Sequence, residues 1–149
     1  METIQNYMIS EHRSCDKAYA QLEDAIVDQD TENAKVFFKL FSDLTNLHLE
    51  KEEEILFPAF EEASGNSMGP TQVMRMEHTQ MRDMIKRIGE LLGQDASKEN
   101  IKKVQGLLET LMILMQQHNM KEEQILYPMT DRALLGDSDH LITSMKEMG

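Results

Sequence analysis

The sequence predicts an all-α fold, an antiparallel up-down four-helix bundle, and three observations lead to this prediction. Leu, Met, Glu, Lys and Gln dominate a chain of 149 residues that has only seven Gly and three Pro, and these five residue types favour helices. Apolar residues recur in steps of three and four. Short breaks separate the long periodic segments. The length suits one domain, so residues 1–149 are expected to form a single domain.

Breaks rich in Gly, Pro, Ser and Asp divide the chain into four long helical segments, at about residues 3–29, 32–63, 70–92 and 98–131. Asp30 and Thr31 are suited to cap the start of the second segment. A short terminal helix is expected after Asp137. Because the connections are short, neighbouring helices are expected to run antiparallel.

Two prolines interrupt the helical pattern, at Pro58 in the second segment and at Pro128 in the fourth. Proline inside a helix removes one backbone hydrogen bond and costs about 3 kcal/mol. We therefore expect a kink or a helix end at each proline.

The sequence also repeats itself. Residues 48–58, HLEKEEEILFP, are identical to residues 118–128, HNMKEEQILYP, at seven of eleven positions. Glu-His pairs at 11–12 and 77–78 match at a similar offset. The first two helices are therefore expected to be a structural copy of the last two, related by a pseudo-twofold axis.

Apolar stripes at helical spacing place several ionisable residues in the expected core. Each of the four helices has one His on its stripe, and the second and fourth helices add a Glu one turn later. We expect the stripes to continue beyond these Glu residues through Ile55 and Ala59, and through Ile125 and Met129. The six ionisable residues expected in the core are His12, His48, Glu52, His78, His118 and Glu122.

These six residues predict a metal site. Burying a carboxylate or an unpaired imidazole costs several kcal/mol per group unless it is compensated, and two divalent cations would compensate all six. Residues four apart on a helix are about 40° apart, whereas residues five apart are about 140° apart. This favours Glu52 over Glu53 and Glu122 over Glu123, although a kinked helix could bring the later residue round. Any one of these His residues alone would indicate an ordinary core histidine, but four at matched positions indicate metal.

Other polar residues near these positions have simpler expected roles. Lys51, Lys121, Glu53 and Glu123 are expected to form solvated pairs on helix faces. The alternative for the two Glu residues is that they hold the ligand imidazoles from outside. His140 is expected at the surface.

Cys15 and Tyr19 are candidates for chemistry beside the metals. Cys15 lies one turn and Tyr19 two turns from His12. An inert core role is the default expectation for Cys15, and a redox role is the alternative.

Charge and hydropathy exclude several partners. The net charge of -12 at pH 7 would repel nucleic acid and anionic lipid. There is no apolar run of 18 residues, and the amino-terminal residues lack the basic start and apolar core of a signal peptide. We therefore expect a soluble cytoplasmic protein with no nucleic acid or membrane partner. The sequence leaves the oligomeric state open.

The motifs HLEKE at 48–52, EH at 77–78 and HNMKE at 118–122 resemble those of the hemerythrin-like (HHE cation-binding) domain family. The resemblance runs from about His12 to Pro128. It implies a helical bundle with two non-haem Fe ions bridged by Glu52 and Glu122, the four His residues being terminal ligands. Mixed nitrogen and oxygen ligation leaves Mn and Zn open.

Within that family, the chain differs from the oxygen carriers. Met74 stands where the carriers have an additional histidine, and Glu122, four residues after its histidine, replaces their aspartate at five. The set of four His and two Glu looks like that of the di-iron iron-sulfur repair and nitric-oxide-responsive members.

This resemblance implies a non-haem di-iron protein that binds or senses oxygen, nitric oxide or a related small oxidant. Transfer of iron or electrons to a protein partner would be a further part of such a role. The first alternative is a di-iron enzyme that consumes peroxide or nitric oxide. The second is a metal buffer without chemistry.

Overall fold

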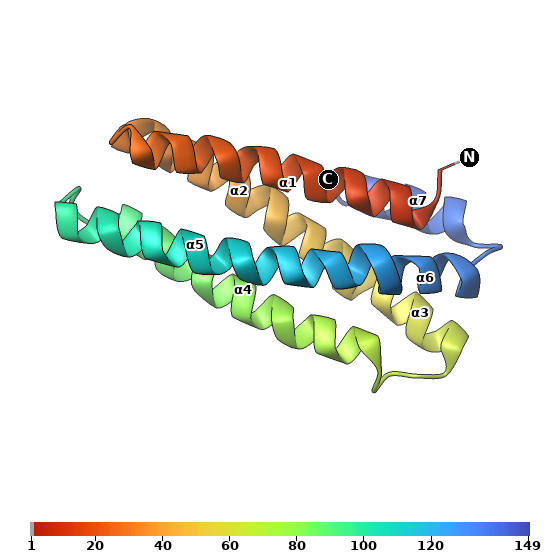
Figure 1. Ribbon diagram of the computed structural model, residues 1–149. Coiled ribbons are helices and arrows are strands. Elements are labelled where there is room, and N and C mark those ends of the chain that lie inside the picture. The colour runs from red at the N-terminus through yellow and green to blue at the C-terminus, as the bar shows by residue number, and fades with distance from the viewer. Residues whose placement is uncertain (1) are drawn as a thin grey trace.

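A computed structural model describes residues 2–149, and these residues form helices and no strand. Figure 1 shows long helices lying lengthwise beside one another as a bundle. The all-α prediction is confirmed. The helices are α1 (Ile4–Val27), α2 (Thr31–Lys51), α3 (Phe57–Ser64), α4 (Pro70–Leu92), α5 (Lys98–Lys121), α6 (Tyr127–Ala133) and α7 (Ser138–Glu147).

The predicted segments agree with these helices to within two residues at each end, α2 with α3 and α5 with α6 each filling one predicted segment. The short helix expected after Asp137 is α7. Side-chain caps explain three of the starts, because Thr3, Asp30 and Ser97 each accept a hydrogen bond from the backbone N–H three residues later. Asp30 therefore has its predicted role.

The helices pack in neighbouring pairs. α1 packs mainly against α2, and α4 packs mainly against α5. The turns that join the members of each pair lie at one end of the bundle, whereas α3, α6 and the amino terminus lie at the other (Figure 1). α7 folds back against α1 and against the turn that follows α2.

The prolines produce an unexpected backbone feature. Residues Glu52–Leu56 and Glu122–Leu126 form π-helical turns. The backbone N–H of Phe57 donates to the backbone carbonyl of Glu52, and that of Tyr127 donates to the backbone carbonyl of Glu122. The helix then resumes with proline in its first turn. Proline has no N–H and its ring clashes with the carbonyl four residues earlier, and a wider turn relieves this conflict. The expected kink or helix end is therefore a π-helical turn just before each proline.

The π-helical turns shift the buried positions that follow them, so the predicted continuation of the stripes was wrong. An additional residue in the turn rotates the later side chains by one position. Ile125 is 56% exposed, and Ile55, Ala59 and Met129 are only partly buried. The fully buried residues are instead Leu56, Phe57, Leu126 and Tyr127.

The apolar core consists of two clusters of buried side chains. One surrounds Leu22, Phe41 and Leu111, towards the turns that join α1 to α2 and α4 to α5. The other surrounds Met8 and Phe57, towards the chain termini. The six ionisable residues of the predicted site lie between the clusters along the helices. Apolar packing therefore closes the polar region from both ends.

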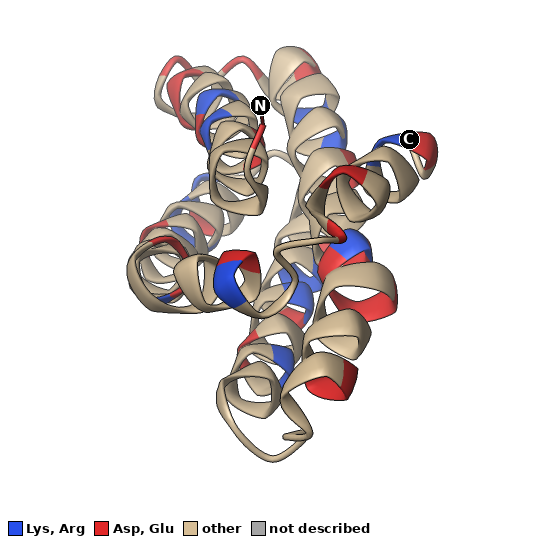
Figure 2. Ribbon diagram, turned by 90° about the vertical axis from the view of Figure 1, so that its right-hand side faces the viewer, with Lys and Arg blue, Asp and Glu red and all other residues tan. Residues whose placement is uncertain are grey.

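The exterior is highly charged. Figure 2 shows acidic and basic residues interspersed along the helices. No helix within residues 2–149 combines the length and the apolar character that crossing a membrane requires.

A pair of neighbouring substitutions in α2 tests the core. Phe41 is buried, with its ring edge-on to Tyr19 at 5.8 Å between centroids, whereas Leu40 is 43% exposed. We expect Phe41→Ala to lower the free energy of unfolding by about 3–5 kcal/mol, because it leaves a cavity. Leu40→Ala should change it by about 0.5 kcal/mol or less. Urea unfolding followed by circular dichroism measures both, and equal losses would contradict this core.

Candidate metal centre

All six residues singled out from the sequence lie together in the interior. His12 comes from α1, His48 from α2, His78 from α4 and His118 from α5, while Glu52 and Glu122 begin the two π-helical turns. All six are buried. Their donor atoms form two groups with metal-binding spacing, which share one residue. The groups are His12, His48 and Glu122, and Glu52, His78, His118 and Glu122.

Short distances join the two groups through the carboxylates. Glu122 Oε1 lies 3.1 Å from His12 Nε2 and 3.2 Å from His118 Nε2. Glu52 Oε1 lies 3.1 Å from His78 Nε2 and 3.4 Å from His48 Nε2. Each carboxylate therefore faces imidazoles from both helix pairs.

A second layer of carboxylates holds the imidazoles from outside. Each ring contacts one carboxylate through Nδ1, the pairs being His12–Glu123 at 2.7 Å, His48–Glu11 at 2.9 Å, His78–Glu53 at 2.6 Å and His118–Glu77 at 2.8 Å. An ionised carboxylate only accepts hydrogen bonds, so each Nδ1 carries the proton and donates it. In the neutral ring, Nε2 then presents its lone pair to the centre. This is the arrangement of metal-binding histidines.

Cations complete this second layer. Lys51 and Lys121 donate to Glu11 and Glu77, and Arg13 and Arg82 donate to Glu123 and Glu53. Burial alone would raise the pKa of the Glu11 and Glu53 carboxyls, but donors from the imidazoles and from these cations lower both to about 2. Glu11 and Glu53 are therefore ionised at neutral pH.

The expectation of solvated helix-face pairs was wrong for Glu53, Glu123 and Lys51, whereas Lys121 forms a partly exposed pair with Glu77. The two Glu residues hold ligand-type imidazoles, as the alternative had it, and Lys51 is only 5% exposed. Glu53, Glu123 and Lys51 face a neighbouring helix, which the spacing within one helix does not reveal.

Sequence reasoning did not assign Glu11 and Glu77 this role. The Glu-His pairs at 11–12 and 77–78 contained the signal. Consecutive residues point about 100° apart on a helix, so a Glu beside a core His faces the adjacent helix. Glu11 of α1 therefore meets His48 of α2, and Glu77 of α4 meets His118 of α5.

Unsatisfied atoms show that the centre fits a metal. Glu52 Oε1, Glu122 Oε2, His78 Nε2 and His118 Nε2 are buried without a hydrogen-bond partner. Buried polar atoms normally have one. Four imidazole nitrogens with two carboxylates are a donor set that suits divalent transition metals. Cations between the two groups would satisfy the unpaired atoms.

When no metal is bound, protons on the inner residues must compensate the negative charge of the two buried carboxylates. Burial and the charge of Glu122 raise the pKa of the Glu52 carboxyl, whereas Glu122 keeps a low pKa despite its burial because imidazolium charge and hydrogen bonds favour its ionised form. Burial opposes protonation of His12 and His78, but the inner carboxylates outweigh it and raise both pKa values to about 9. The metal-free centre is therefore held by imidazolium-carboxylate pairs.

Tyr127 is a residue of the centre that sequence reasoning missed. Its buried hydroxyl oxygen lies 2.9 Å from Glu52 Oε2, 3.0 Å from Glu122 Oε1, 3.2 Å from His12 Nε2 and 3.4 Å from His48 Nε2. Burial and the charges of Glu122 and Glu52 raise its pKa well above the usual value. In a regular helix a residue five after Glu122 points away, and only the π-helical turn brings it back.

Tyr19 and Cys15, the two candidates for chemistry beside the metals, have contacts outside the groups of metal-type donors. Tyr19 donates its hydroxyl hydrogen to the backbone carbonyl of Leu108 at 2.8 Å. Cys15 is buried, burial raises its pKa to about 11, and it belongs to neither group of metal-type donors among the described residues. These positions favour the inert core role for Cys15. His140 is exposed, as predicted.

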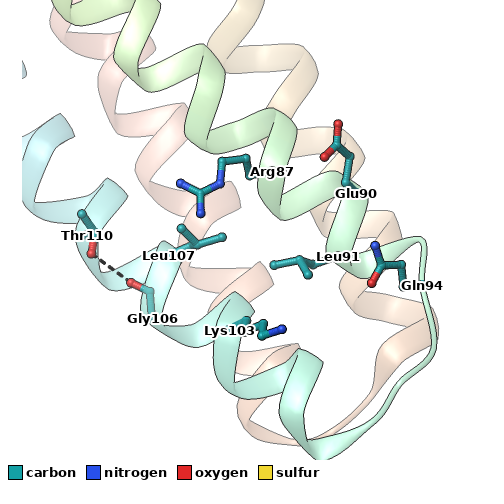
Figure 3. Close-up of a pocket in the computed structure, with 8 residues that line it drawn as sticks. All are labelled: Arg87, Glu90, Leu91, Gln94, Lys103, Gly106, Leu107 and Thr110. Atoms are coloured by element: carbon teal, nitrogen blue, oxygen red, sulfur yellow. Dashed lines mark hydrogen bonds between the residues drawn. The ribbon is translucent and has the colours of Figure 1, made fainter.

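A surface groove lies elsewhere on the molecule. Figure 3 shows this groove of about 550 Å³ between α4 and α5, with Arg87 and Glu90 on one helix and Lys103 and Thr110 on the other. It contains none of the six residues and lies more than two helical turns from the nearest of them along either helix. The buried centre is therefore the candidate functional site.

The metal-free protein should lose stability as pH rises. The pKa values of His12 and His78 are raised from the usual 6.5 to about 9, so their contribution is fully present below pH 6.5 and is lost as pH rises through 9. Urea unfolding in the presence of a chelator should show a loss on the order of 3 kcal/mol for each of the two imidazoles between those limits. Unfolding free energy that stays constant or increases over this range would contradict the prediction.

The family model described as the hemerythrin HHE cation binding domain matches residues 3–130. Neither the curated proteins nor the solved structures contain a match. The matched region includes all six inner residues, both π-helical turns and the four outer carboxylates. The chain therefore belongs to the hemerythrin HHE cation-binding domain family.

Proposed function

We propose that this protein is a non-haem di-iron protein that binds or senses oxygen, nitric oxide or a related small oxidant. The observation that carries the proposal is the set of four inward-facing Nε2 atoms around two buried carboxylates. The proposed iron ligands are His12, His48, Glu52, His78, His118 and Glu122.

The distances support two cations rather than one. Glu52 directs Oε1 towards His78 at 3.1 Å, whereas its Oε2 faces the half of the site that holds Tyr127. Glu122 Oε1 lies almost equally far from His12 and His118. Carboxylates with this placement can bridge one cation held by His12 and His48 and another held by His78 and His118.

A di-iron centre, when bound, supplies a change of oxidation state and open coordination positions for a small molecule. The protein holds the imidazoles in their metal-binding tautomer through the outer carboxylates. It also excludes bulk water, because the apolar clusters close both ends and Phe57 stacks on His78 at 5.6 Å between ring centroids. Such a site suits a diatomic molecule or peroxide better than a larger substrate.

A second candidate function is an enzyme that consumes peroxide or nitric oxide. Tyr127 favours this candidate, since its hydroxyl group is a proton-carrying, redox-capable group within 3.4 Å of four inner donor atoms. A metal buffer without chemistry would have no need of such a group.

We take residues 1–149 as one domain, an antiparallel up-down four-helix bundle with a pseudo-twofold repeat. Two matched sets support the repeat, since His48, Glu11 and Lys51 interact as His118, Glu77 and Lys121 do.

The set of four His and two Glu residues favours the repair and nitric-oxide-responsive subgroup of the family. We also propose a cytoplasmic protein, and the net charge of -12 argues against nucleic acid and anionic membrane partners.

Metal analysis with anaerobic spectroscopy tests the main proposal. Protein purified without added metal should contain about two irons per chain and should develop new absorption bands with oxygen or nitric oxide. Catalytic loss of peroxide or nitric oxide would establish the enzyme instead. Zinc in place of iron would overturn the redox role. Iron that mild chelation removes easily and that does not respond to either gas would identify a buffer.

Ligand substitutions should change the metal content in proportion to the groups they disrupt. Glu122 belongs to both donor groups and His118 to one. We expect Glu122→Ala to abolish most metal binding, and His118→Ala to reduce it from about two ions to about one per chain. His140→Ala, at an exposed position, is the control and should retain the native content. Retention of both ions by Glu122→Ala would refute the assignment.

The outer carboxylates should control metal affinity without contacting metal. Glu77→Gln removes the charge that faces Nδ1 of His118, and we expect metal affinity to fall by about 10–100-fold. Glu90→Gln, on the exposed face of the same helix, should have no effect. Competition with a chromophoric chelator measures both, and equal affinities for the two variants would argue against this outer layer.

A further inference from the structure

The two halves of the centre differ at one matched position. In the repeated segments, Phe57 corresponds to Tyr127, and each is the buried first residue after its π-helical turn. The ring of Phe57 lies 5.6 Å from that of His78, and the ring of Tyr127 lies 5.7 Å from that of His12. The rings are therefore placed alike, but only Tyr127 carries an oxygen atom into the centre.

The surroundings of that oxygen exceed what a hydroxyl group can satisfy. Four donor atoms lie within 3.4 Å of it, from His12, His48, Glu52 and Glu122. A hydroxyl group can donate its one hydrogen to one of them and accept hydrogen bonds from at most two others. Hydrogen bonding therefore accounts for part of this arrangement, and the convergence of all four atoms needs another cause.

The spacing of these atoms matches that of ligands around one metal ion. Bonds of about 2.1 Å in octahedral geometry place neighbouring ligand atoms about 3.0 Å apart. His12 Nε2 lies 3.1 Å from His48 Nε2 and 3.1 Å from Glu122 Oε1. The Tyr127 oxygen lies 2.9–3.4 Å from all four donor atoms. It therefore lies at ligand spacing from all three donor atoms of the group formed by His12, His48 and Glu122.

We propose that Tyr127 is a direct ligand of the metal ion held by His12 and His48, and that the ion held by His78 and His118 has no such ligand. The inference rests on the two-metal centre proposed above. When the bond forms, the phenol O–H bond breaks, the proton passes to solvent, and an oxygen lone pair binds the metal without any change of oxidation state.

This difference makes the two metal positions unequal. The position beside Tyr127 gains a protein oxygen and loses one vacancy, whereas the position beside Phe57 keeps its vacancy next to an apolar ring. An anionic oxygen ligand also favours the ferric over the ferrous ion at its own position. The small molecule therefore binds on the Phe57 side.

Resonance Raman spectroscopy of the ferric protein tests the proposal directly. The native protein should show a tyrosinate-to-iron charge-transfer band, and excitation into that band should enhance tyrosinate ring vibrations. Deuteration of the tyrosine rings should shift these vibrations. Mössbauer spectra should show two unequal iron sites of equal area.

Two variants identify the tyrosine. Tyr127→Phe converts this position into its counterpart in the other half, and we expect the band to disappear while iron content and helical circular dichroism are retained. Tyr19→Phe removes a buried hydroxyl group that donates to a backbone carbonyl and should leave the band intact. A band that survives in Tyr127→Phe would overturn the assignment.

The native protein alone decides the question if the variant does not fold. A native protein with about two irons but without tyrosinate vibrations would overturn the role of Tyr127 and leave the di-iron proposal standing. A native protein that binds no iron would overturn both.

Discussion

The structure depends on the cost of burying six ionisable groups between two apolar clusters. The inner imidazoles and carboxylates come from every long helix of the bundle, so the helices cannot pack unless these charges are compensated. The outer carboxylates orient the imidazoles. Each one fixes the proton on Nδ1 of its imidazole and turns Nε2 inward, where it can bind a cation. Lys51, Lys121, Arg13 and Arg82 form ion pairs with those carboxylates. The packing of the helices and the geometry of the site therefore depend on the same network of charged groups.

The π-helical turns connect the backbone to the chemistry of the centre. Each turn begins at an inner carboxylate, Glu52 or Glu122, and ends just before an aromatic residue and a proline. The wider turn allows the carboxylate and the aromatic side chain five residues later to face the same interior. Phe57 and Tyr127 consequently cover the centre from the side of the termini. A backbone adjustment required by proline thus closes the metal site.

The centre has two similar halves, and this likeness makes the difference at the aromatic position meaningful. Each half has two imidazoles, an inner carboxylate and two outer carboxylates held by cations. The aromatic position that follows each π-helical turn changes from Phe57 to Tyr127. Because a phenol carries a donor oxygen and a phenyl ring carries none, similar scaffolds can present unequal environments to bound metal. A site of this kind can keep one position for structure and the other for a small molecule.

Local spacing determined much of this protein from the sequence alone. The stripes in α1 and α4 and the i, i+4 pairs His48–Glu52 and His118–Glu122 follow from the helical period, so the helices and the six inner residues could be predicted. Only the tertiary structure decided which carboxylate holds which imidazole, since Glu11 reaches His48 on another helix. It also decided the place of Tyr127, because a π-helical turn breaks the period on which the prediction relied. Contacts across helices depend on the packing of whole elements, which no spacing within a single helix contains.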